Sequence, residues 1–149
     1  MPRYQGFFKP KNPSKYKGDP TNIVYRSGWE LKLMLYLDQR KNVIQWSSEE
    51  LIIPYISPID NKIHRYFPDF YMKVKQKDGS NKKFIIEVKP KSQLKPPNKN
   101  PNRRTKRWLT EVRTYVVNRA KFDSATEYCK DKGFEFKILT EDHLAPNYK

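Results

Sequence analysis

The stretch Phe67-Pro68-Asp69-Phe70, followed by Glu87-Val88-Lys89, decides both the fold and the chemistry that this chain is expected to have. Asp78-Gly79 lies near the middle of the intervening segment, which is typical of two strands joined by a tight turn. Such a hairpin can bring two carboxylates and one lysine to the same end of a strand pair. These are the groups that metal-assisted cleavage of a phosphodiester requires.

The two runs that flank the turn, residues 70–75 and 84–88, alternate as half-buried strands do. Their apolar side chains all stand at even positions: Phe70, Met72, Val74, Phe84, Ile86 and Val88. Residues opposite each other in an antiparallel pair share a face, so the two apolar sets meet only if even residues pair with even residues.

A three-residue loop, Lys77-Asp78-Gly79, meets this condition because it pairs residue 76 with residue 80. It also places the glycine where such loops need a left-handed residue. A two-residue loop would pair an odd residue with an even one. The three-residue loop sets Asp69 opposite Glu87, and we expect both on the face directed away from the core.

Lys89 follows on the same side as Asp69 and Glu87, and these three residues are the predicted catalytic set. Two carboxylates at cross-strand distance repel, so a cation should lie between them. Lys89 is one candidate, and a divalent ion bound by Asp69 and Glu87 is the other; Mg²⁺ prefers such oxygen ligands. The alternative is a surface ion-pair cluster, but Pro68-Asp69 in register with Glu87-Val88-Lys89 favours the functional interpretation.

Glu30 is a further candidate acid, near the start of a helix expected from Ser27 to about Arg40. It stands three residues after Ser27, as in a capping box, so its carboxylate can serve the helix terminus. Its alternative role is a third catalytic acid, and one side chain cannot fill both roles fully. Glu49 and Glu50 are interpreted as turn residues.

The remaining pattern predicts an α/β chain with a mixed sheet. Short strands are expected at residues 43–46, 51–56 and 63–67, and a last strand at 134–139. A helix is expected from about Trp108 to Lys132, with Gly133 as its C-terminal stop. Since this helix lies between two strands, the last strand should run parallel to a central one.

Charge is the second strong signal: the 149 residues carry a formal net charge of +15. Such an excess indicates a polyanionic partner, with DNA the leading candidate. No apolar run is long enough to span a bilayer, and no signal peptide is visible, so a membrane partner and secretion are not expected. Cys129 is the single cysteine, which excludes an intramolecular disulfide, and it is expected to be a small buried thiol.

Residues 1–22 are predicted to form a basic, extended arm, because prolines and lysines dominate this segment. Lys15 and Lys17 of the arm are further candidate DNA-binding residues. Aromatic residues are interleaved with the cations: Tyr4, Phe7, Phe8 and Tyr16. They can stack on DNA bases or pin the arm to the domain surface, and the sequence favours neither interpretation. Residues 23–149 are predicted to form one domain.

Residues 90–107 are predicted to form a flexible basic loop directly after Lys89. The stretch contains no acid and holds seven candidate DNA-binding residues: Lys91, Lys95, Lys99, Arg103, Arg104, Lys106 and Arg107. If the loop neutralises four phosphates of duplex DNA, the logarithm of the affinity should fall with the logarithm of salt at a slope of about −3.6. The alternative is a disordered, solvated connector.

Pro68-Asp69 with Glu87-Val88-Lys89 resembles the signature of the PD-(D/E)xK, or restriction-endonuclease-like, nuclease superfamily. This resemblance implies a core in which a helix precedes a β-meander, followed by a second helix and a strand. It also implies that the acidic pair binds Mg²⁺ or Mn²⁺ and that the lysine assists hydrolysis. Many members add a glutamate from the first helix, which tips the interpretation of Glu30 towards function.

Other segments resemble the head-completion nucleases of large tailed bacteriophages: 16–22, 25–27, 65–70 and 137–143. The resemblance implies a role in finishing DNA-filled capsids before tail attachment. It implies the host cytoplasm during phage assembly as the location, with the virion as a second one, and phage portal or neck proteins as candidate partners beside DNA.

Three functional hypotheses remain at this point. The first is a metal-dependent DNA endonuclease. The second is a non-catalytic DNA-binding protein that completes the capsid on a nuclease-like fold. The third is a transposon-type subunit that is active only with a partner.

Overall fold

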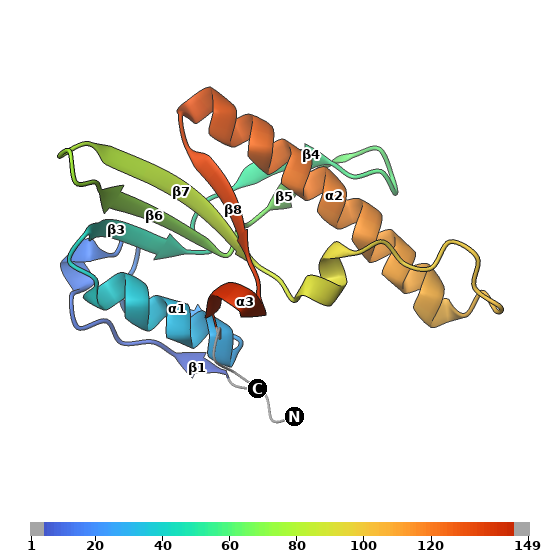
Figure 1. Cartoon of the computed structure of the whole chain (residues 1–149), viewed down its shortest axis with the longest axis horizontal. Coiled ribbons are helices and arrows are strands. Elements are labelled where there is room, and N and C mark those ends of the chain that lie inside the picture. Colours follow the sequence, from blue (N-terminus) through green and yellow to red (C-terminus); the bar gives the residue numbers. More distant parts are fainter. Residues whose placement is uncertain (1–4, 145–149) are drawn as a thin grey trace.

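The computed structural model describes residues 5–144 and shows a four-stranded mixed sheet with a helix on each face (Figure 1). Its strands, in spatial order, are β3 (Val43–Ser48), β6 (Phe70–Lys75), β7 (Asn81–Val88) and β8 (Glu135–Leu139). The pairs β3–β6 and β6–β7 are antiparallel, and β7–β8 is parallel. The predicted mixed sheet and its parallel last strand are confirmed.

The register of the β6–β7 hairpin is the one that the apolar pattern predicts. Phe70 lies opposite Ile86, and Lys75 lies opposite Asn81. The loop is closed by the N–H of residue 76, which donates to the carbonyl oxygen of residue 80 at 2.8 Å. Gly79 has a φ of +87°, the left-handed conformation that the loop needs. One step beyond Phe70 and Ile86, the same register sets position 69 opposite position 87.

The helix α1 (Gly28–Gln39) covers the even face of the hairpin. It begins after Ser27, whose Oγ accepts a hydrogen bond from the Glu30 N–H at 3.1 Å. Apolar side chains of this helix join the even-numbered strand residues in a first hydrophobic core, which includes Leu33, Met34, Leu37, Trp46, Phe70, Phe84 and Ile86. The hairpin alternation and the helix cap therefore build this layer together.

The helix α2 (Lys106–Lys132) starts two residues before the predicted position. Thr105 caps it, because the Thr105 Oγ1 accepts a hydrogen bond from the Trp108 N–H at 3.1 Å. The helix ends at Gly133, which has a φ of +73°, as predicted for a glycine that stops a helix.

The odd face of the hairpin is also buried, so the prediction that it points away from the core is wrong. Ile85 is fully buried, and it shares a second hydrophobic core with Ala125 and Cys129 of α2. Glu87, on the same face, is only 4% exposed. The alternation identified one apolar face, but a helix more than fifteen residues further along the chain covers the other.

A second hairpin, β4 (Ile53–Ile56) with β5 (Ile63–Tyr66), forms a separate two-stranded sheet beside α2 (Figure 1). Ile53, Tyr55 and Tyr66 contribute to the second core. This hairpin interrupts the expected meander between β3 and β6 and brings Tyr66 beneath the helix.

The N-terminal segment lies along the domain and contains regular structure. β1 (Gly6–Phe7) pairs with β2 (Val24–Tyr25), and a 3₁₀ helix, η1 (Pro13–Lys15), lies between them. The segment is also bonded to the main sheet, because the Lys17 N–H donates to the Trp46 carbonyl of β3 at 2.8 Å.

Two of the interleaved aromatics pin this segment to the domain. Phe8 and Tyr16 are buried in the first core, with ring centroids 5.9 Å and 4.8 Å from that of Trp46. Base stacking is therefore wrong for these two side chains in this structure. Tyr4 lies outside the described residues.

Cys129 is buried in the second core, as predicted, and burial raises the pKa of its thiol to about 11. A thiol in such surroundings is a packing group rather than a nucleophile. Within residues 5–144, no helix has the length and apolar character needed to cross a membrane.

Candidate active site

Asp69 stands at the entry to β6, directly after the buried Pro68. Its Oδ2 accepts a hydrogen bond from the Val88 N–H at 2.7 Å, across the end of the hairpin. Its carbonyl accepts a hydrogen bond from the Glu49 N–H at 3.1 Å. The first contact fixes the carboxyl group and the second fixes the backbone of Asp69, while its Oδ1 makes no hydrogen bond within the described part of the chain.

Glu87 lies opposite Asp69 near the end of β7 and is held by two donors. The Tyr66 hydroxyl donates to its Oε1 at 2.5 Å, and the Lys89 Nζ lies 3.4 Å from its Oε2. The structure thus brings together the three predicted side chains, Asp69, Glu87 and Lys89. Lys89 is one-quarter exposed, so its amine reaches both the carboxylate and solvent.

The electrostatics of the pair are set by burial and by the proximity of the two carboxyl groups. The pKa of Asp69 is raised to about 8, mainly by burial and next by the charge of Glu87, while the Val88 N–H and the Lys89 amine oppose the rise. The raised pKa belongs to Asp69, whose carboxyl has one backbone donor, whereas the Glu87 carboxylate contacts both the Tyr66 hydroxyl and the Lys89 amine.

Glu30 does not accept from the Ser27 N–H as a capping box requires, and its catalytic role stays a prediction. Its Oε1 accepts a long hydrogen bond, 3.4 Å, from the Arg26 N–H, and its Oε2 is 3.4 Å from the Ser27 hydroxyl. Its charge nevertheless helps to raise the pKa of Asp69, and burial raises the pKa of Glu30 itself. It therefore lies at the edge of the acidic site while serving the helix terminus.

Sequence analysis missed three residues beside the site. Glu49 has a positive φ of 55°, as a turn residue can, but its carboxylate also forms an ion pair with Arg26. Its charge raises the pKa of Glu30. Tyr66 was missed because only the packing of the β4–β5 hairpin against the sheet brings its hydroxyl to Glu87. No local pattern in the sequence signals these contacts.

The donor set fits a divalent cation. Among the residues that the structure describes, no three His, Cys, Asp or Glu side chains are arranged to hold a metal by themselves. Mg²⁺, however, usually takes one or two carboxylates and completes its shell with waters and substrate phosphates. Asp69 and Glu87 supply those two carboxylates, and burial together with the charge of Glu87 raises the pKa of Asp69, an effect that a bound cation would oppose.

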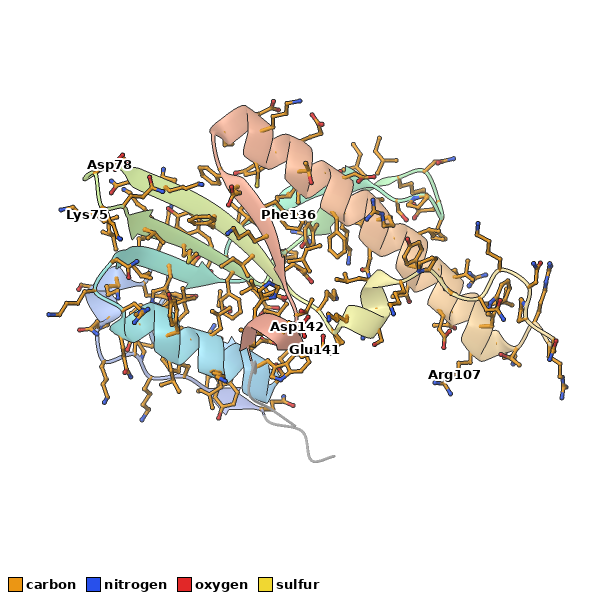
Figure 2. All side chains as sticks on the ribbon, viewed as in Figure 1. Lys75, Asp78, Arg107, Phe136, Glu141 and Asp142 are labelled. Atoms are coloured by element: carbon orange, nitrogen blue, oxygen red, sulfur yellow. The ribbon has the colours of Figure 1, made fainter. Side chains whose placement is uncertain are left out.

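The basic segment after Lys89 leads away from the site along α2. A 3₁₀ helix, η2 (Lys91–Leu94), starts it, and the short helix α3 (Glu141–Leu144) anchors it. The Lys91 N–H donates to Glu141 at 2.8 Å, and the Lys91 amine forms an ion pair with Asp142. Figure 2 shows both acids where β8 runs into α3.

Some candidate DNA-binding side chains already contact other groups of the protein, and others are exposed to solvent. The Lys15 amine donates to the carbonyls of Asp38 and Arg40 at 2.9 Å and 2.8 Å, so it caps the end of α1. The Arg104 guanidinium lies 5.6 Å from the Trp108 ring centroid. The other basic side chains of the loop are exposed: Lys95, Lys99, Arg103, Lys106 and Arg107.

The hydroxyl of Tyr66 should matter for both stability and activity. Tyr66→Phe leaves a buried carboxylate with one donor fewer, which costs about 1–3 kcal/mol. We expect a lower unfolding midpoint in denaturant and slower cleavage at saturating metal. A matched control is Tyr71→Phe, which removes a hydroxyl bound to Gln45 at 2.9 Å, away from the acids. Equal cleavage rates for both variants would contradict a role of Tyr66 in the site.

Comparisons with known proteins agree with this geometry. The model of the TnsA-like endonuclease N-terminal family matches residues 40–141, a span that includes Asp69, Glu87 and Lys89 but not Glu30. The chain is 42% identical over 144 residues to the head completion nuclease of Enterobacteria phage T4, covering 95% of this chain and 93% of that protein. The chain therefore belongs to the TnsA-like endonucleases, which are nucleases with a restriction-endonuclease-like fold.

Proposed function

We propose that this chain is a metal-dependent DNA endonuclease that hydrolyses phosphodiester bonds at Asp69, Glu87 and Lys89 and acts in phage head completion. One observation carries the proposal: the hairpin register places Asp69 opposite Glu87, with the Lys89 amine 3.4 Å from the Glu87 carboxylate. The net charge of +15 supplies the affinity for DNA that such a site needs.

Asp69 and Glu87 are the residues that would hold Mg²⁺ or Mn²⁺, in line with the general use of divalent metals in this family of nucleases. The ion would supply Lewis-acid polarisation of the phosphate and a water of lowered pKa. Asp69 must release its proton first, and the Val88 N–H then keeps one of its oxygens fixed.

Lys89 is assigned the role of orienting the attacking water and balancing charge as the phosphate is attacked. Its amine is beside Glu87 and partly open to solvent, so it can donate to both. Glu30 is assigned a supporting role through its negative charge near Asp69.

The basic loop is assigned to the DNA backbone. It begins directly after Lys89, so a strand whose phosphate reaches the acids would pass along the exposed cations of residues 95–107. Lys17 is available as well, since its amine lies over the Tyr71 ring, whereas Lys15 serves the fold.

The phage role rests on the T4 relative, which is named a head completion nuclease. Identity of 42% across nearly the whole of both chains supports the same role here. We propose that the protein acts in the host cytoplasm during assembly and on finished heads, with DNA as its substrate and portal or neck proteins as partners.

The test is incubation of the purified chain with plasmid and linear DNA in Mg²⁺, Mn²⁺ or chelator. We expect nicked or linearised plasmid with at least one metal and intact plasmid with chelator. Calorimetry should also show metal binding that is lost in Glu87→Gln. DNA binding without cleavage or Glu87-dependent metal binding would instead support a structural DNA-binding protein.

A further inference from the structure

A second pocket lies outside the acidic site, between the start of the basic loop and α2. It has a volume of about 530 Å³ and is lined by residues 92–97 on one side and by the first half of α2 on the other. Figure 1 shows the loop running beside that half of the helix. Trp108 holds the loop in place, since its Nε1–H donates to the Asn98 carbonyl at 2.7 Å. The volume is in the range of pockets that bind small ligands.

The lining of this pocket suits a nucleotide. The half-buried Tyr115 presents an aromatic ring, and Pro96 and Pro97 add apolar surface opposite it. Arg107 is ion-paired with Glu111 at 3.2 Å, so the two lining charges offset each other. Lys95 remains as the cation without an ion pair among the described residues.

Asn118 gives the strongest sign of a ligand. It is 8% exposed and lines the pocket, and its side-chain amide makes no hydrogen bond to any part of residues 5–144. The amide atoms are not sealed from solvent, so they are open to a ligand in the pocket. An amide offers both a donor and an acceptor, which match the hydrogen-bonding edge of a nucleobase.

The pocket is close to the acidic site along the chain. Ser92, in its wall, is three residues from Lys89, so their backbones lie within about 11 Å. From Asn118, Lys121 is one helical turn onward, about 4.5 Å along the axis. The amine of Lys121 lies 5.7 Å from the ring centroid of Tyr66, the residue that donates to Glu87.

We propose that this pocket binds one unpaired base of the DNA strand, within about three nucleotides of the bond that is cut, at 3.4 Å per step along a strand. This inference rests on the proposed function. The base stacks on Tyr115 and hydrogen-bonds to Asn118, while Lys95 contacts a phosphate. A paired base cannot enter because it would first have to leave the stack, so the pocket selects DNA with unpaired nucleotides.

The test is DNA binding in chelator, measured by fluorescence anisotropy on one duplex in three forms. The first form is a blunt duplex, the second carries a short single-stranded overhang, and the third carries the same overhang made of abasic nucleotides. We expect the wild type to bind the overhang with bases about tenfold more tightly than the overhang without bases, because only a base can both hydrogen-bond to Asn118 and stack on Tyr115. The blunt form should bind no better than the overhang without bases.

Asn118→Leu should lose most of this tenfold ratio and leave blunt-duplex binding unchanged. It should not lower the melting temperature, because the Asn118 amide makes no hydrogen bond within residues 5–144 that the change would break. Asn42→Leu, the same change at an exposed position between α1 and β3, should retain the ratio.

Equal binding of the two overhangs by the wild type would overturn the proposal, whatever the variant does. A retained ratio in Asn118→Leu would overturn it as well. Neither result depends on cleavage, so a failure of the pocket and a failure of the proposed nuclease activity are distinguishable.

Discussion

Lys89→Ala and Asp69→Asn should each abolish DNA cleavage while DNA binding persists. Lys89 supplies the only amine in ion-pair contact with Glu87 among the described residues, and Asp69 supplies one of the two predicted metal ligands. Removing one preorganised group that stabilises a transition state commonly lowers the rate about a hundred- to a thousandfold. We therefore expect a loss of at least about a hundredfold in plasmid cleavage, with anisotropy showing nearly unchanged DNA affinity.

The same hairpin offers matched controls. Lys75→Ala and Asp78→Asn repeat the chemical changes at the turn end, and Figure 2 shows both residues far from the end of the sheet where Glu141 and Asp142 lie. Both control variants should cut plasmid at the wild-type rate. Unchanged cleavage by Lys89→Ala together with Asp69→Asn would refute the assignment of the site.

Asp69→Asn should also stabilise the metal-free protein, increasingly so as the pH rises. The folded state raises the pKa of Asp69 from 3.8 to about 8. The folded protein therefore binds a proton that the unfolded chain releases, and wild-type stability falls as the pH rises through this range. Asparagine does not titrate, so the gain in melting temperature should be small near pH 4 and largest above pH 8. The corresponding gain in the free energy of unfolding should reach the order of a few kcal/mol above pH 8.

Two controls separate this effect from a general change in stability. Asp78→Asn should change stability in the opposite direction. Hydrogen bonds from Ser80 lower the pKa of Asp78, so its carboxylate stabilises the fold above pH 4, and the asparagine variant loses that stabilisation. Saturating Mg²⁺ should raise the melting temperature of the wild type but not of Asp69→Asn. A pH-independent difference between Asp69→Asn and wild type in chelator would contradict the buried, protonated state of Asp69.

The hairpin could be predicted because its evidence is local. Even-numbered apolar residues on both strands and Asp78-Gly79 allow one register, and that register places Asp69 opposite Glu87. Ser27 and Gly133 likewise mark helix ends through hydrogen bonds and backbone conformations within a few residues. The start of α2 was placed late because the capping signal at Thr105 lies inside a long basic stretch.

The electrostatics of the site could not be predicted, because they depend on burial. If the odd face were exposed to solvent, Asp69 would have an ordinary carboxyl pKa, and Lys89 would be the only side chain in contact with the Glu87 carboxylate. In the structure, α2 and the β4–β5 hairpin cover that face, so Asp69 is desolvated and Tyr66 reaches Glu87.

The sequence by itself thus determined the pairing of the two acids, the position of the lysine and the preference for a polyanion, because side-chain alternation and charge are properties of the chain before it folds. Tertiary structure alone decided that burial raises the pKa of Asp69, that Glu49 and Arg26 lie near it, and that Asn118 lines a pocket between the basic loop and α2. The physical reason is that desolvation and long-range contacts arise only when segments distant in sequence pack together.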